Sequence, residues 1–114
     1  MMVRAVRGAI KVSGNDTFAD GVNKLISALQ QKNGISESDL ISIVFSQTKD
    51  ITANPATALR GFGYAETPLF CTQEPEYEGT EPGLLRVLLT FETKNPKSVP
   101  VYLDGAEKLR KDLT

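Results

Sequence analysis

Arg86 is the most unusual residue of the chain because it interrupts the most strand-like segment, residues 84–93. Alternation in this segment places Leu85, Val87, Leu89 and Phe91 on one face, and Leu84, Arg86 and Leu88 on the other. A strand that is apolar on both faces is usually buried, and an unpaired buried charge is costly. We therefore expect Arg86 to face an anion, either a ligand or a nearby glutamate, unless its side chain snorkels at a sheet edge.

Two further arginines could join Arg86 in binding an anion. Arg7 lies in the first expected strand, residues 2–12, and Arg60 lies near the end of a short expected helix. Each of them alone could be an ordinary surface arginine. Together, the three guanidinium groups could line a pocket for a dicarboxylate, because a guanidinium fork pairs with a carboxylate through two hydrogen bonds.

Cys71 and Glu74 stand three residues apart at the end of another expected strand, residues 69–72. They could place a thiol and a carboxylate at the rim of one pocket. Cys71 could instead be a small buried hydrophobic residue, and Tyr102 could be a half-buried aromatic side chain. The glycines of RGFGYA (60–65) follow no strand and precede no long helix, so they do not predict a nucleotide-binding loop.

The composition excludes several kinds of site. The chain has no histidine, which excludes Ser-His-Asp and Cys-His nucleophile systems and histidine metal ligands. Its single cysteine excludes an intrachain disulfide and a CxxC redox or zinc motif. The 13 Lys and Arg residues nearly balance the 14 Asp and Glu residues, which argues against a partner of nucleic acid held by bulk charge.

The length of 114 residues fits a single domain that spans residues 1–114. No apolar run approaches the ~18 residues of a membrane span, and the first residues, MMVRAVRGAIKV, lack the layout of a signal peptide. We therefore expect a cytoplasmic protein without a membrane partner. Its chemistry would rest on Arg, Glu, Tyr, Lys or Cys side chains.

Hydrophobic patterning predicts the element order β-α-β-α-β-β with short connections. The first helix has an apolar stripe at helical spacing from residue 18, capping side chains at residues 15–17, and an end near Gly34. Asn54 and Pro55 are typical of a helix start and open a short helix over 56–63. Expected strands cover 2–12, 40–45 (largely buried), 69–72 and 84–93. Residues 101–103 form a short extended piece, and the tail carries Ala106, Leu109 and Leu113 to dock. The order predicts an α/β or α+β fold, a mixed sheet with helices on one face.

Motifs along the chain give a stronger signal jointly than any one of them does alone. They are Arg7-Gly8-Ala9, Cys71-x-Gln73-Glu74, Arg86-Val87 and Val101-Tyr102-Leu103. With the segments NPATALR, PLFCTQE, LLRVLLTFET and VYLDGAEKLRKDLT, they resemble the AroH-type (Bacillus-like, trimeric) monofunctional chorismate mutases. The resemblance spans nearly the whole chain in the correct order.

The resemblance implies a homotrimer with a pseudo-α/β barrel and three active sites in the clefts between subunits. It implies an isomerase that carries out the Claisen rearrangement of chorismate to prephenate, on the route to phenylalanine and tyrosine, without cofactor or metal. Because this reaction is unimolecular and pericyclic, it needs no nucleophile. A protein can help by holding the reactive conformer and by stabilising charge that develops on the ether oxygen.

The family pattern also implies roles for single residues. Arg86 is the cation at the ether oxygen, and Arg7 and Tyr102 bind the side-chain carboxylate. Glu74 accepts a hydrogen bond from the ring hydroxyl, with the Cys71 thiol beside it. The other implied substrate contacts are Arg60, which adds positive potential, an apolar wall of Leu69, Phe70 and Leu109, and the pair Ala56 and Thr57.

The loop over residues 53–58 departs from the family pattern A-x-F-P-A-K/E-A. It is one residue shorter, with Asn54 in place of the aromatic residue and Thr57 in place of the charged one. Since this loop partly covers the substrate in the family, substrate affinity could be lower than typical. An Arg-His pair common before the last strand is also replaced, by Val99-Pro100. Neither change affects the residues with the main implied roles, which are Arg7, Glu74, Arg86 and Tyr102.

Three other functions remain open on the residues alone. A trimeric RidA-type enamine or imine deaminase has a similar fold and interface sites, but it needs an arginine motif that Leu109-Arg110-Lys111 match poorly. A non-catalytic regulatory domain of ferredoxin-like build would bind amino acids, and is normally fused to an enzyme. The third is a protein of the mutase fold that has lost its activity.

Overall fold

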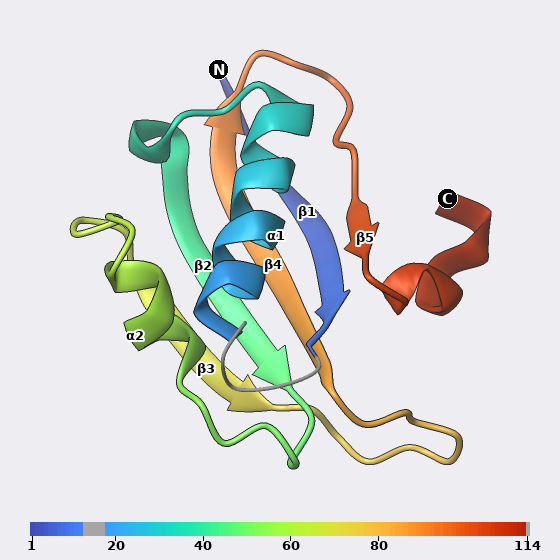
Figure 1. The fold of residues 1–114 in the computed structure, drawn as a ribbon. Coiled ribbons are helices and arrows are strands. Elements are labelled where there is room, and N and C mark those ends of the chain that lie inside the picture. Colours follow the sequence, from blue (N-terminus) through green and yellow to red (C-terminus); the bar gives the residue numbers. More distant parts are fainter. Residues whose placement is uncertain (13–17, 114) are drawn as a thin grey trace.

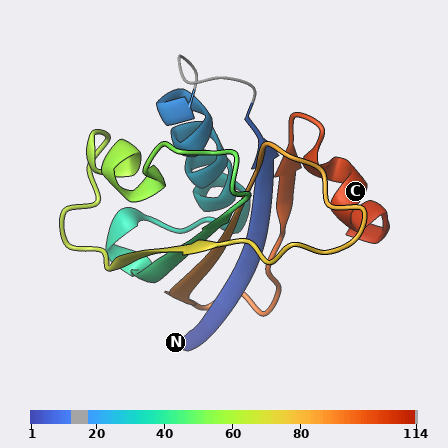
Figure 2. The same ribbon diagram turned by 90° about the horizontal axis from the view of Figure 1, so that it is seen from below.

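The computed structural model describes residues 1–12 and 18–113, and over these residues it forms one five-stranded sheet with α-helices on one side (Figures 1 and 2). The strands are β1 (Met2–Lys11), β2 (Leu40–Gln47), β3 (Leu69–Gln73), β4 (Leu84–Thr93) and β5 (Val101–Leu103), in the spatial order β3-β2-β4-β1-β5. β4 runs antiparallel to β1 and β2, whereas β3 is parallel to β2 and β5 is parallel to β1. The predicted mixed sheet with helices on one face is confirmed.

α1 (Phe18–Asn33) crosses the middle of the sheet and buries the predicted apolar stripe (Figure 1). Val22, Leu25 and Leu29 are fully buried against the strands. Gly34 follows the helix with a φ of +61°, a left-handed conformation that commonly ends helices. The capping side chains predicted at residues 15–17 lie outside the described residues. A short 3-10 turn, η1 (Glu37–Asp39), leads into β2.

α2 (Pro55–Arg60) lies on the same side of the sheet as α1 (Figure 2). It begins as predicted, because the Asn54 side chain accepts a hydrogen bond from the backbone N–H of Thr57 at 3.1 Å. The helix ends three residues earlier than predicted. Gly61 is its C-cap, and Gly63 has a φ of +126°, which is incompatible with a continuing helix.

The two faces of the sheet differ in composition. The helix face, which packs against α1 and α2, carries the buried core residues Val6, Ile10, Ile43, Phe45, Leu85, Val87, Leu89 and Phe91. The opposite face, called the open face here, carries Arg7, Val44, Ser46, Phe70, Arg86 and Leu88. Leu88 is 41% exposed, and Ile41 of β2 is 38% exposed. The prediction that β4 is buried on both faces is therefore wrong for the single chain. The prediction that residues 40–45 are largely buried is confirmed, since only Ile41 among them is exposed.

The C-terminal 3-10 helix η2 (Ala106–Leu113) covers one end of the open face. Ala106 is fully buried and Leu109 is partly buried, and both pack with Ala9, Leu84 and Tyr102. The predicted docking of the tail is confirmed for these two residues, whereas the Leu113 side chain lies outside what the structure describes. Among the helices of the described residues, none is long and apolar enough to cross a membrane.

Candidate active site

Arg7, Arg86 and Tyr102 come together on the open face. They line a cleft of about 240 Å³, whose walls include Ser46 and Leu88. The register of the strands explains this meeting. Ala9 of β1 lies between Arg86 of β4 and Tyr102 of β5, and Arg7 of β1 lies opposite Leu88 of β4. The three side chains therefore project from three adjacent strands into one space.

Glu74 joins this group from the end of β3. Its backbone N–H donates to the Gln47 carbonyl at 2.7 Å, which extends the parallel ladder by one residue. Its carboxylate accepts a hydrogen bond from the Ser46 hydroxyl at 2.7 Å and lies 3.5 Å from Nε of Arg86. Arg86 was predicted to face either a ligand or a nearby glutamate, and within one chain Glu74 is that glutamate.

The exposure of this ion pair is uneven. The Glu74 side chain is only 9% exposed, whereas that of Arg86 is 44% exposed. The expected burial of Arg86 is therefore wrong for the single chain, because the open face around it is not covered by α1 or α2. What the pair presents outward is the guanidinium group, since the carboxylate lies beneath it.

The cleft continues past Arg86 toward η2. A second depression of about 360 Å³ is lined by Arg86, Lys108, Leu109 and the loop over residues 77–81. Leu109 and Arg86 therefore share one depression, as the resemblance implied. The predicted apolar wall is only partly assembled, because Phe70 lies on the open face and its neighbour Leu69 packs against the core on the helix face.

Cys71 does not lie beside Glu74. It stands opposite the fully buried Phe45 and so belongs to the helix face, where its thiol is 3.8 Å from Oδ1 of Asn54. The Glu74 carboxylate turns to the open face instead, toward Ser46. The prediction that the thiol and the carboxylate share one pocket rim is wrong within one chain. The alternative of a buried Cys71 is wrong as well, since the residue is exposed at the sheet edge.

Arg60 does not join Arg7 and Arg86 within one chain. Its guanidinium group donates hydrogen bonds to the backbone carbonyl oxygens of Tyr64 and Thr67, the latter at 3.0 Å. These bonds hold the loop after α2, in which Tyr64 has a φ of 64°. The predicted contacts Ala56 and Thr57 belong to α2 and lie on this same side of the sheet.

Ser46 was not singled out from the sequence. Alternation along residues 40–47 places it on the same face as Val44, but a serine in a strand is no chemical signal by itself. Its importance follows from the register, which places Ser46 opposite Thr72 on one side and Arg86 on the other. Knowledge of the parallel pairing of β2 with β3 would have been needed to find it.

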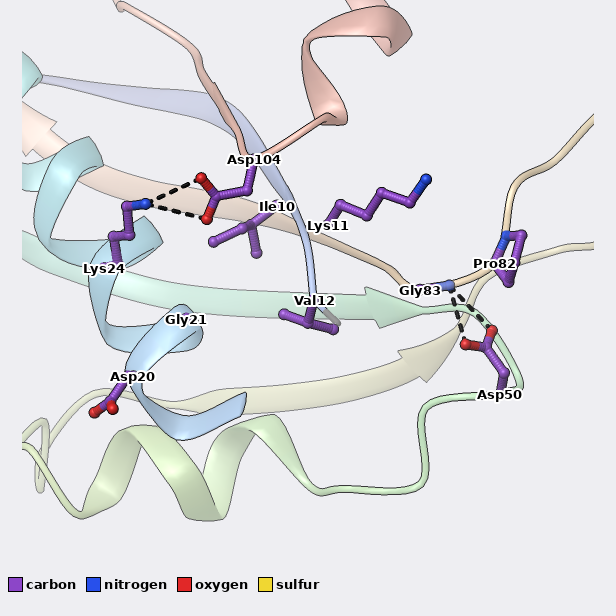
Figure 3. A pocket seen from close by; sticks show the side chains of 10 residues that line it. All are labelled: Ile10, Lys11, Val12, Asp20, Gly21, Lys24, Asp50, Pro82, Gly83 and Asp104. Atoms are coloured by element: carbon purple, nitrogen blue, oxygen red, sulfur yellow. Dashed lines mark hydrogen bonds and ion pairs between the residues drawn. The ribbon is translucent and has the colours of Figure 1, made fainter. Parts of the chain in front are cut away.

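A larger cavity of about 550 Å³ lies at another place, beside the start of α1 (Figure 3). It contains none of the predicted site residues. Its lysines are already paired with carboxylates, Lys24 with Asp104 at 3.0 Å and Lys11 with Glu81 at 3.1 Å. The smaller cleft presents two guanidinium groups against one carboxylate, so it suits an anionic ligand better. Within residues 1–12 and 18–109, whose side chains the structure describes, no cluster of three acidic or cysteine side chains could hold a metal ion.

Comparison with known proteins finds relatives over nearly the whole chain. A family model described as chorismate mutase type I matches residues 3–113. A protein of Thermus thermophilus named Chorismate mutase AroH is 36% identical over an alignment of 118 positions, gaps included, which covers 98% of this chain and 97% of the relative. A protein of the same name from Bacillus subtilis (strain 168) is 32% identical over an alignment of 121 positions, which covers 100% of this chain and 94% of the relative.

A solved structure gives the same result for the fold. It is a chorismate mutase from Clostridium thermocellum, which matches with a TM-score of 0.87 and 38% sequence identity. The match covers 92% of this chain and 98% of the solved one. These similarities agree with the resemblance seen in the sequence and give no support to the imine deaminase alternative.

Proposed function

This chain belongs to the chorismate mutase type I family and is an enzyme of that activity, and we propose that it converts chorismate to prephenate in the cleft of Arg7, Arg86 and Tyr102. The observation that carries this placement is the meeting of two guanidinium groups, a phenol and the Glu74 carboxylate on one face of the sheet. Chorismate has two carboxylates, a ring hydroxyl and an ether oxygen. These side chains offer a matching group to the side-chain carboxylate, the hydroxyl and the ether oxygen.

The reaction needs no nucleophile and no proton transfer. The ether C–O bond breaks as a C–C bond forms in the same molecule, so a protein can act by holding the compact conformer. It can also stabilise negative charge that develops on the ether oxygen. We assign the second task to Arg86. Its shortest contact with Glu74 is from Nε, at 3.5 Å, and the guanidinium group has further N–H donors to offer a ligand.

The other side chains of the cleft hold the substrate. Arg7 and the Tyr102 hydroxyl bind the carboxylate of the enolpyruvyl side chain, since both can donate hydrogen bonds and Arg7 adds charge. Glu74 accepts a hydrogen bond from the ring hydroxyl. Each carboxylate oxygen has two lone pairs, so its contacts with Ser46 and Arg86 leave capacity for this third partner.

A second copy of the chain completes the site in this proposal. The remaining implied contacts, Ala56, Thr57, Arg60, Leu69 and Cys71, belong to the α2 side of the sheet and do not face the open-face cleft of their own chain. The cleft of one chain, about 240 Å³, is also smaller than the roughly 300–1,000 Å³ of most ligand sites. The assembly is a homotrimer with a pseudo-α/β barrel and sites between subunits.

The exposed apolar residues of the open face support this assembly. Phe70 is 66% exposed, Val3 63% and Leu88 41%. Phe70 and Leu88 both lie opposite Val44, and exposed apolar surface of this kind commonly marks a contact with another protein. The proposal further includes a single chorismate mutase domain over residues 1–114, a cytoplasmic location, and a role in phenylalanine and tyrosine biosynthesis without cofactor or metal.

Loss of the ultraviolet absorbance of chorismate tests the activity, with prephenate confirmed by acid conversion to phenylpyruvate. Saturable loss above the uncatalysed rate, carried by a trimer in sedimentation, is the expected result. A folded trimer that does not accelerate the loss would refute the proposal.

Subunit mixing tests the shared site. Arg86→Ala damages the open face, and Cys71→Glu introduces a charge on the α2 side, so each variant alone should be inactive. If each site combines the two sides from different subunits, random mixing restores about one site in four. Mixed trimers without recovered activity would show that each chain forms its own site.

A further inference from the structure

Ser46 lies at the centre of a row of residues that crosses the open face. On β2 it stands between Thr72 of β3 and Arg86 of β4, and it lines the cleft with Arg7 and Tyr102. The side chain is partly buried. A hydroxyl in this place could serve only strand packing, or it could act on the charged groups beside it.

The contacts of Glu74 indicate that the Ser46 hydroxyl acts on the Glu74 carboxylate. The short contact of its carboxylate is the hydrogen bond from Ser46 Oγ to Oε1 at 2.7 Å, while the other oxygen, Oε2, is 3.5 Å from Arg86 Nε. The backbone of Glu74 is fixed through Gln47, but three side-chain torsions remain between this backbone and the carboxylate. Ser46 is therefore the group that sets where the carboxylate lies.

This arrangement keeps the Glu74–Arg86 pair from closing fully. A carboxylate and a guanidinium group in contact usually form two parallel hydrogen bonds. Here the hydrogen bond from Ser46 fixes the position of one oxygen, and the shortest N···O distance between the carboxylate and the guanidinium group is 3.5 Å. A carboxylate released from Ser46 could take two guanidinium N–H groups and neutralise the charge that faces the cleft.

We propose that Ser46 is a positioning residue, whose hydroxyl holds the Glu74 carboxylate so that the Arg86 guanidinium stays available to the ether oxygen. This inference rests on the proposed function. Ser46 touches no reacting atom in this scheme and acts through Glu74. Its loss should reduce kcat more than it changes KM, because the charge at the ether oxygen is needed most in the transition state.

Threonine and valine at position 46 isolate the hydroxyl, because they have nearly the same shape and only threonine keeps the donor. Both suit a strand. We expect Ser46→Val to lower kcat about tenfold with KM within about threefold. Ser46→Thr should keep kcat within about threefold of the unmodified chain. Ser42→Val is the matched control, since Ser42 lies on the same strand and face, opposite Thr90, and it should leave both constants unchanged.

A double-mutant cycle separates positioning from packing. If Ser46 acts through Glu74, adding Ser46→Val to Glu74→Ala causes no further loss of kcat. An additive loss would overturn the inference, and so would equal kcat values for the threonine and valine variants in an active enzyme. Absence of turnover by the unmodified trimer would instead refute the proposed function, and this inference with it.

Discussion

Replacement of Arg86 by alanine should separate catalysis from stability. Within one chain, Arg86 is 44% exposed and its ion pair with Glu74 is long, at 3.5 Å, so the pair contributes about 1 kcal/mol or less to the folding of that chain. By contrast, loss of a group that stabilises a developing oxyanion costs about 3–4 kcal/mol in the transition state. That cost lowers kcat by roughly two to three orders of magnitude. The Ser46 hydrogen bond to Glu74 remains, so the carboxylate keeps a partner.

Two assays measure these effects independently. The absorbance of chorismate gives kcat, and a thermal melt followed by circular dichroism gives the stability of the same preparation. Arg86→Lys is the control: it keeps the charge but loses the planar fork, so its kcat should lie between the other two. Near-normal kcat for Arg86→Ala would refute the role of the guanidinium group. A collapse of the melting temperature would refute the argument from exposure.

Three further outcomes follow from the structure. Arg7→Ala should raise KM as well as lower kcat, because a carboxylate contact exists in both ground and transition states; unchanged KM in steady-state kinetics would contradict this. Gly8→Ala should cost about 1–3 kcal/mol in denaturant unfolding, since a Cβ there would lie 2.7 Å from Cδ1 of the buried Leu29; an unchanged midpoint would mean that α1 shifts freely. Hydrogen bonding with Thr48 lowers the pKa of Asp50, so its ionised form stabilises the fold above the unfolded pKa near 4, and this contribution is lost as pH falls. Asp50→Asn should therefore flatten the acid side of the stability profile, and an identical profile would remove Asp50 from the account.

The elements that follow local rules could be predicted from the sequence. The apolar stripe of α1 has a single helical period, and the start of α2 depends on Asn54 and the residues next to it, so both are determined by neighbours in the chain. β4 could be predicted from its own ten residues as well, because they have high strand propensity. The residue types alone suggested that Arg7 and Arg86 share a pocket, and only the family resemblance added Tyr102, since the convergence depends on how three strands pair.

The errors concern side chains whose direction depends on parity or on loops. Cys71 and Glu74 are three apart, and alternation alone places such residues on opposite faces of an extended chain. Their predicted common pocket therefore conflicted with the strand predicted beside it. Arg60 illustrates the other case. Its carbonyl partners Tyr64 and Thr67 belong to an irregular loop, whose path no local periodicity specifies.

The wrong burial of β4 is the most informative error. Leu84, Arg86 and Leu88 have the pattern of a strand covered on both faces, yet Leu88 is 41% exposed in the chain. The apolar pattern of a strand reflects the burial of that strand in the assembled protein. One chain covers the open face only at the η2 end. In the proposed trimer, the neighbouring subunit covers the rest and brings its own α2 side to Arg86. The exposed leucine and the incomplete cleft then have one explanation, which is that both lie where the neighbouring subunit binds.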